Sequence, residues 1–484
     1  MKILITHSYF LRFDPKQWSL QQPYAPLGAM YAASVLRKIN CDVNFHDTMF
    51  AEKADEVIEP LNKLKPDWFI IYDDGFNYLT KMCLTNMRDA AFEMIQLAKK
   101  NGCKVAVSSS DSTDHSEEYL NRGADVVFLG EAEETIQELI TLDKQGQNWQ
   151  HIKGIASKVD KNVVCNARRL VIKNLDEIPF PAWDLIDVLQ YKQRWLQSSG
   201  YFSINMGTTR GCPYKCNWCA KPIYGNRYNS RSVENVVEEL SRLKTLYQFD
   251  HVWFCDDIFG LKQGWVKSFA DLLEKEHLSF KFKIQSRVDL LLEDKQIADL
   301  ARAGCSNVWV GAESGSQKIL DAMDKGTQVE QIYEATRLLK KNGIQPAFFI
   351  QFGYPGETMQ DIEQTIKMIN DLLPEDIGVS VSYPLPSTKF YEQVKHELVN
   401  KSNWSDSDDL ALMFKNTYQP EFYKQLHRYV HKNYRKHQAL DTIKHLFKSP
   451  QKSNFITFKR AASYAWYVPA TLLEKQKLNR LRHE

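Results

Sequence analysis

The 484-residue sequence has no long hydrophobic run. Its longest apolar candidate, residues 461–473, contains three aromatic residues and is interrupted by Pro469. A membrane span needs roughly 18 or more consecutive apolar residues. The first ten residues, MKILITHSYF, contain no long apolar segment and no small-residue cleavage site, so we expect no signal peptide. These absences predict a cytoplasmic protein without a membrane-spanning helix.

The sequence also lacks an overall charge imbalance. It has 62 Lys and Arg against 60 Asp and Glu, so its net charge gives no reason to expect a nucleic acid partner. The charge is nevertheless uneven, because residues 421–484 contain fourteen basic and four acidic residues. A basic C-terminal region of this kind can be a solvated helical face, can contact an anionic membrane peripherally or can bind an acidic partner. The sequence leaves these alternatives open.

Cysteine is scarce and unevenly distributed. Of nine cysteines, six are scattered and three are clustered. A reducing cytosol keeps scattered cysteines as thiols, so the cluster needs a separate explanation. The chain has no internal repeats, no low-complexity tract and no phosphate-binding G-x-G-x-x-G motif, which argues against a repeat protein and a dinucleotide site.

Residues 1–150 alternate between short apolar runs and helix-patterned segments. The runs are residues 3–5, 68–71, 105–107 and 126–129. Short buried strands separated by helices predict an α/β domain with a doubly wound parallel sheet. Such sheets bind ligands at the carboxyl ends of their strands. Here those ends carry the polar, turn-rich segments 72–75, 108–111 and 130–133.

The rest of the chain divides into three parts. Residues 151–195 show little periodicity and are expected to be a linker, and residues 396–484 are expected to be a helical C-terminal region. Between them, residues 196–395 contain six strand-like runs separated by helix-patterned segments. A complete eight-unit barrel needs about 250 residues, so we expect a partial (β/α)6 barrel. The six runs are residues 202–206, 252–255, 282–285, 308–311, 347–352 and 378–382.

The clustered cysteines, Cys212, Cys216 and Cys219, have the spacing C-x3-C-x2-C and follow the first barrel strand. Three thiolates on one loop can ligate three irons of a [4Fe–4S] cubane and leave the fourth iron open. A structural zinc site usually has four ligands, and the nearest further candidates, His251 and Cys255, lie on the next strand. The loop therefore predicts an iron–sulfur cluster, and the alternatives are a zinc knuckle or three unrelated thiols.

This loop, with an aromatic residue before its last cysteine, resembles that of the radical S-adenosylmethionine (SAM) enzymes. The resemblance implies that SAM chelates the open iron and that an electron from the cluster cleaves SAM to a 5′-deoxyadenosyl radical. It also implies a SAM-binding set at the strand ends, in which Glu313 binds the ribose or the methionyl end. Glu313 could alternatively cap a helix. The implied set is Trp218, Arg287, Glu313, Ser314, Gln351 and Gly353.

The N-terminal region resembles the cobalamin-binding domain of B12-dependent radical enzymes through residues 123–135, 26–28 and 175–179. A cobalt-ligating D-x-H-x-x-G loop is absent, which leaves open whether His7 reaches the metal or is polar surface. Ser-Ser-Ser-Asp replaces the Gly-Gly-Pro-His of relatives at residues 108–111. A domain without ligand, or one that binds a nucleotide, is the alternative. The implied cobalamin contacts are Asp74, Gly75, Ser108, Ser109, Asp111, Gly130 and Glu131.

Together these resemblances cover about residues 1–395, and they are nearest to the anaerobic magnesium-protoporphyrin IX monomethyl ester oxidative cyclase branch. They imply a cobalamin-dependent radical SAM enzyme that modifies an unactivated carbon of a small molecule, by methyl transfer. An electron donor such as flavodoxin or ferredoxin is expected as a partner. The alternatives are cyclase-like oxidation or rearrangement without methyl transfer, and a cobalamin-binding regulator with a vestigial barrel. The intact cysteine triplet argues against the regulator.

Overall fold

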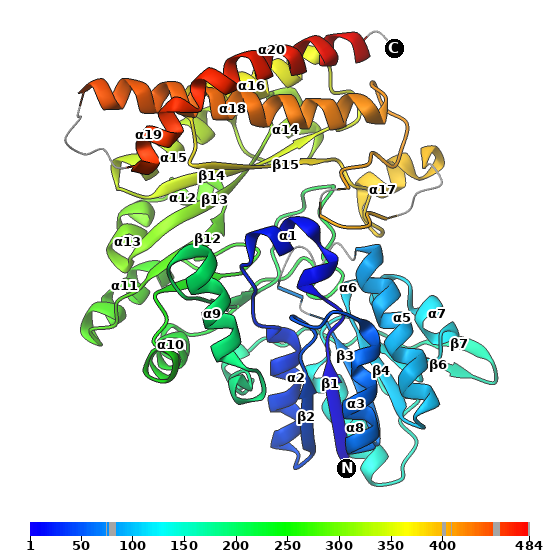
Figure 1. Ribbon diagram of the computed structural model, residues 1–484. Coiled ribbons are helices and arrows are strands. Elements are labelled where there is room, and N and C mark those ends of the chain that lie inside the picture. The colour runs from blue at the N-terminus through cyan, green and yellow to red at the C-terminus, as the bar shows by residue number, and fades with distance from the viewer. Residues whose placement is uncertain (74, 77–83, 399–402, 408, 449–454, 483–484) are drawn as a thin grey trace. The chain divides into compact units, whose positions relative to one another are not determined.

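The computed structural model describes the chain except for residues 74, 77–83, 399–402, 408, 449–454 and 483–484 (Figure 1). The chain folds into two compact units. The first spans residues 1–214, 220–285 and 403–409, and the second spans residues 215–219, 286–402 and 410–484.

The first unit contains the expected N-terminal parallel sheet. Its first five strands are parallel to their neighbours and have the order β2-β1-β3-β4-β5. The strand order reverses at β1 and β3, which is where sheets of this topology bind their ligands. The strands are β1 (Lys2–Thr6), β2 (Asp42–His46), β3 (Trp68–Tyr72), β4 (Lys104–Ser108) and β5 (Val126–Phe128).

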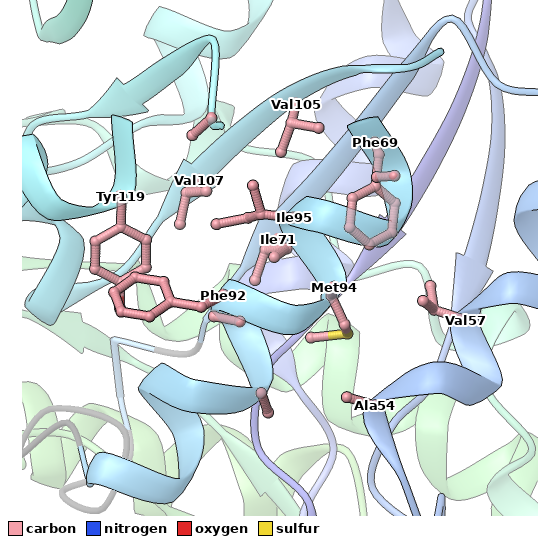
Figure 2. Packing of buried hydrophobic residues seen from close by; sticks show 14 of the residues in the cluster. Ala54, Val57, Phe69, Ile71, Phe92, Met94, Ile95, Val105, Val107 and Tyr119 are labelled. Atoms are coloured by element: carbon pink, nitrogen blue, oxygen red, sulfur yellow. The ribbon is translucent and has the colours of Figure 1, made fainter. Parts of the chain in front are cut away.

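Both faces of this sheet are buried because successive strand residues point to opposite sides. Ile3 and Ile5 belong to one apolar cluster and Leu4 to the other. In the second cluster, Ile95 of a covering helix lies against Val107 of β4 (Figure 2). The sheet is therefore doubly wound, as predicted. The first face is covered by α2 (Leu27–Lys38) and α8 (Glu133–Lys144), and the second by α3 (Ile58–Leu64) and α5 (Thr85–Lys100).

The segment expected to be a linker adds two strands to the same sheet. β6 (Ile155–Val159) pairs antiparallel with β5, and β7 (Asn162–Cys165) pairs antiparallel with β6. The turn between them uses Asp160 and Lys161 in the left-handed region, at φ 48° and 70°. Hairpin turns of this kind usually contain Gly or Asn. Because neither Gly nor Asn occupies these two turn positions, the sequence did not predict the hairpin.

The six expected barrel strands are all present in a second sheet of the order β15-β14-β13-β12-β11-β8. The pairs β8–β11, β11–β12, β13–β14 and β14–β15 are parallel. β8 and β15 form its two edges, so the sheet is an open partial barrel. The strands are β8 (Ser203–Met206), β11 (His251–Phe254), β12 (Lys281–Ser286), β13 (Cys305–Glu313), β14 (Gln345–Phe352) and β15 (Asp376–Val381).

The C-terminal region is helical, as expected. The long helix α18 (Pro420–Lys448) is followed by α19 (Phe455–Ala462) and α20 (Tyr464–Leu481), and α20 packs along α18 (Figure 1). Among the residues that the structure describes, no helix is both long enough and apolar enough to cross a membrane.

Candidate functional site

The three cysteines lie on the loop between β9 (Thr209–Arg210) and β10 (Asn229–Ser230), which form an antiparallel pair at its base. All three are half-buried and take part in no disulfide. Gly211 precedes the first of them at φ 78°, and a Cβ there would collide with the carbonyl oxygen of Arg227. Within the described residues, no three His, Cys, Asp or Glu side chains converge as metal ligands would. Binding of a cluster by the loop stays a prediction.

Cationic side chains lie beside one of the thiols. Arg287 Nη1 is 3.9 Å from Cys216 Sγ. Burial alone would lower the pKa of Lys325, but Glu313 and Cys216 raise it above its ordinary value. Positive charge at this place can offset the negative charge of a thiolate-ligated cluster. The residues around Cys216 therefore fit an anionic thiolate-bound cluster.

Asn217 fixes the middle of the cysteine loop. Its backbone N–H donates to the Met323 carbonyl at 3.1 Å, and its side-chain amide donates to the Ala322 carbonyl at 2.7 Å. Tyr354 Oη donates to Asn217 Oδ1 at 3.0 Å. These carbonyls belong to the end of α14 (Gln317–Ala322) and have no partner within that helix. The neighbouring Trp218 has a buried indole N–H without a hydrogen-bond partner in the structure.

Glu313 ends β13 in a buried ion pair. Its Oε1 is 2.8 Å from Lys325 Nζ, and both side chains are almost fully buried. Glu313 adopts φ 58°, a left-handed conformation that is uncommon outside glycine and concentrates at functional sites. A Cβ on Gly311 would lie 2.6 Å from Lys325 Nζ, so the pair depends on that glycine. The next helix, α14, begins after Ser316 and receives no side-chain cap there, so Glu313 is not its cap.

We expect Glu313→Gln to lower the affinity for SAM by roughly tenfold to a hundredfold, as the loss of a charged hydrogen bond worth about 1.5–3 kcal/mol implies. Lys325→Gln is the control, because it breaks the same ion pair but keeps the Glu313 carboxylate. Equilibrium binding of SAM and a melting curve on each variant separate the effects. A lowered melting point with unchanged SAM affinity in Glu313→Gln would remove Glu313 from the predicted contacts.

Three further predicted SAM contacts are hydrogen-bonded within the protein at the ends of β13 and β14. Ser314 Oγ lies 3.1 Å from Thr365 Oγ1, on α16 (Met359–Leu372). Gln351 Nε2 donates to a serine hydroxyl at 3.1 Å, and Gly353 N–H donates to Glu357 Oε2 at 2.7 Å. Arg287 donates to the Lys325 carbonyl at 2.9 Å. These residues lie at or next to the carboxyl ends of strands in the second sheet. Their contact with SAM stays a prediction.

Glu357 is a buried acid that the sequence did not single out. Burial raises its pKa from 4.5 to about 8, and its Oε1 atom has no hydrogen-bond partner in the structure. The folded protein therefore keeps this carboxyl protonated at pH values where the unfolded chain has ionised it. The free energy of unfolding should fall by about 1.4 kcal/mol per pH unit from this group as the pH rises from about 4.5 to about 8.

We expect Glu357→Gln to remove this pH dependence and to be more stable than the wild type at pH 8. The amide is neutral, and its oxygen can still accept the hydrogen bond from Gly353. Urea unfolding at pH 5, 6.5 and 8 measures the effect. Glu363→Gln, at an exposed position of α16, is the control. Parallel stability curves for wild type and Glu357→Gln would contradict the prediction.

Polar side chains meet at the carboxyl ends of β1 and β3, where the strand order of the first sheet reverses. The Ser8 backbone N–H and hydroxyl donate to the two Asp73 carboxylate oxygens at 2.6 and 2.8 Å. His7 Nε2 lies 2.9 Å from Asp47 Oδ1. Burial would raise the pKa of Asp47, but hydrogen bonds with His7 and Tyr191 hold it below its ordinary value. A partly buried carboxylate thus holds the His7 ring.

The predicted cobalamin contacts on β4 and β5 also have protein partners. Ser109 Oγ accepts from the Ser112 N–H at 2.8 Å and caps α6 (Ser110–Asp114). Asp111 accepts from Arg88 Nε at 2.7 Å. Ser108 ends β4, and its carbonyl accepts from the Asp73 N–H at 2.8 Å. Gly75 lies close to Tyr224, and Asp74 lies outside the described residues.

Arg210 is a residue that the sequence did not single out. Its guanidinium is 2.6 Å from Glu131 and 2.7 Å from Glu133, and all three side chains are at most 5% exposed. It also lies over the rings of Tyr31, Phe76 and Tyr224, at 5.3–5.7 Å from their centroids. Glu131 and Glu133 follow a buried strand, and buried carboxylates need a cationic partner. Only the fold shows that this partner is Arg210. Glu131 is thus engaged by Arg210, and Gly130 precedes it at φ 88°.

Comparison with known proteins shows what this chain is similar to. The radical SAM superfamily matches residues 206–369. An uncharacterized methyltransferase of Pyrococcus horikoshii is 29% identical over 386 residues, which are 78% of this chain and 80% of that protein. The anaerobic magnesium-protoporphyrin IX monomethyl ester cyclase of Rubrivivax gelatinosus is 26% identical over 387 residues, which are 77% and 66% of the two chains.

Two solved structures share the fold. The cobalamin-dependent SAM radical enzyme OxsB with aqua-cobalamin bound superposes with a TM-score of 0.76 at 19% identity, over 98% of this chain and 72% of that one. The radical SAM methyltransferase TsrM from Kitasatospora setae, with cobalamin and a [4Fe-4S] cluster bound, gives a TM-score of 0.68 at 18% identity, over 82% and 74%. Residues 206–369 of this chain therefore match the radical SAM superfamily, and the chain shares the fold of these two cobalamin-binding radical SAM enzymes.

Proposed function

We propose that this protein is a cobalamin-dependent radical SAM methyltransferase that acts on an unactivated carbon of a small molecule. The observation that carries the proposal is the charge arrangement at Cys216, where Arg287 and the buried Glu313–Lys325 pair lie beside a thiol of the cysteine loop. When bound, a [4Fe–4S] cluster and cobalamin supply the electron for SAM cleavage and a carrier for the methyl group. The methyltransferases among the relatives support methyl transfer.

The chain's own residues have separate tasks in this proposal. Cys212, Cys216 and Cys219 hold the cluster, and Arg287 and Lys325 offset its negative charge. Glu313 binds a hydroxyl or ammonium group of SAM. The predicted residues at the carboxyl ends of β3, β4 and β5 hold cobalamin, next to the place where the strand order reverses.

The product balance tests the reaction. Protein reconstituted anaerobically with iron, sulfide and cobalamin is incubated with SAM and a reductant, and the products are measured by mass spectrometry. Roughly equal amounts of 5′-deoxyadenosine and S-adenosylhomocysteine support methyl transfer. Deoxyadenosine alone would replace it with cyclase-like oxidation or rearrangement. If neither product forms, the remaining alternative is a cobalamin-binding regulator with a vestigial barrel.

His7 gives a separate test of the cobalamin assignment. Because Asp47 and Thr48 both lie within hydrogen-bond distance of its ring, we expect cobalamin to bind with no protein histidine on cobalt. Electron paramagnetic resonance of the Co(II) state of the full chain should show no nitrogen splitting from His7, and His7→Ala should leave the spectrum unchanged. A nitrogen triplet that disappears in His7→Ala would contradict this prediction.

The reaction also implies a cellular setting. Reductive cleavage needs a low-potential electron, so the proposal includes a donor such as flavodoxin or ferredoxin and a reducing cytoplasm. Replacing a chemical reductant with purified flavodoxin and its reductase in the same assay checks the donor. The proposal also includes peripheral contact between the basic C-terminal region and a membrane.

A further inference from the structure

The last helix, α20, exposes three large apolar side chains, and the residues that it buries are Thr471, Glu474 and Leu478. Glu474 is 6% exposed, accepts from Gln425 Nε2 on α18 and pairs with Lys432. Trp466, Leu472 and Leu473 are 59%, 58% and 57% exposed, and the exposed Trp466 ring has the Lys432 ammonium 5.7 Å from its centroid. A helix that only packs on a protein core turns its large apolar side chains inward. The outward face of α20 is therefore built to contact something else.

These exposed side chains form one stripe. Residues three or four apart share a helix face, so Trp466, Pro469 and Leu473 lie in line, and Leu472 lies beside them. The same face continues to Lys477 and Arg480, both exposed. Over 18 residues the helix is about 27 Å long. One side of α20 is thus apolar near its beginning and basic near its end.

The charge of the region selects among partners. Residues 421–484 contain fourteen basic and four acidic residues. Helix α19, which packs against α20, adds Phe458 at 57% exposure next to Lys459 and Arg460. A second copy of this chain would bring two strongly basic regions together, which is unfavourable. An anionic surface would be attracted.

We propose that the exposed face of α20, with Phe458 of α19, docks on an anionic phospholipid surface. Trp and Leu on one face with Lys and Arg around them is the composition of helices that lie in the membrane interface. The apolar side chains enter the headgroup region, and the basic ones bind lipid phosphates. The peripheral membrane contact proposed above is thus assigned to one face of α20 and to anionic phospholipids. This assignment does not depend on the proposed methyl-transfer reaction.

Vesicle co-sedimentation of the full chain tests the proposal. Wild-type protein should bind vesicles of phosphatidylcholine with phosphatidylglycerol, and should bind pure phosphatidylcholine at least tenfold more weakly. Added salt should weaken binding to the anionic vesicles. Trp466→Ala/Leu473→Ser should reduce binding at least tenfold, and Lys477→Glu should reduce it by more than the fivefold that one basic residue contributes.

Leu246→Ser is the matched control, because Leu246 is 67% exposed in the first unit, and it should bind like the wild type. All substitutions are at exposed positions, and a melting curve confirms folding. The double variant should cleave SAM in vesicle-free solution at the wild-type rate. No wild-type binding to anionic vesicles would overturn the proposal, as would equal binding by the double variant. A dimer that the double variant abolishes, without vesicle binding, would also overturn it in favour of a second copy.

Discussion

Replacing Cys212, Cys216 and Cys219 together by Ala should abolish the broad brown absorbance of the reconstituted protein, its bound iron and all formation of 5′-deoxyadenosine. Three thiolates are the cluster's only expected protein ligands, so the loss should be complete. The fold should survive, because the half-buried thiols lie on a loop outside both sheets. Visible absorption, iron analysis and product analysis measure the first effects, and circular dichroism measures the last.

Cys165→Ala is the control for the cysteine variants, because Cys165 is an exposed free thiol on β7. It should keep the absorbance, the iron and the SAM cleavage of the wild type. Reductive SAM cleavage that persists in the triple variant would show that the loop is not the cluster site. A triple variant with lost ellipticity would point to a structural role for the thiols.

Arg210→Met should destabilise the protein by about 3–5 kcal/mol, because it leaves two buried carboxylates without their cation. Methionine retains much of the length and the packing of the arginine stem, so the loss of charge dominates. Arg210 directly precedes Gly211 and Cys212. We therefore also expect the variant to retain less iron and to lose it faster in air. Urea unfolding and iron analysis over time measure the two effects.

Substituting the two acidic partners of Arg210 tests whether the lost stability comes from unpaired charge. Adding Glu131→Gln and Glu133→Gln to Arg210→Met removes the unpaired charges and should restore about half or more of the lost stability. Arg168→Met is the control, because Arg168 is exposed, and it should change stability by no more than about 0.5 kcal/mol. A triple variant as unstable as Arg210→Met would show that packing, and not charge, makes Arg210 important.

Much of the fold could be predicted from local sequence patterns. Short apolar runs such as residues 68–71 and 105–107 predicted the strands β3 and β4, because a strand buried on both faces must be apolar throughout. The six strands of the second sheet were predicted from strand-like runs separated by helix-patterned segments. The hairpin of β6 and β7 was not, because its turn residues, Asp160 and Lys161, carry no turn signature.

The sequence by itself was enough to predict a cysteine-ligated iron–sulfur cluster and radical SAM chemistry. The spacing of Cys212, Cys216 and Cys219 is a local property of one loop, and it predicts a cluster without knowledge of the fold. Only the tertiary structure decided which distant charges meet. Arg210 reaches Glu131 across 79 positions of sequence, and Lys325 reaches Glu313 across 12. Buried charges need partners, but any of 62 basic residues could have supplied them, and only the packing of strands and loops selects one.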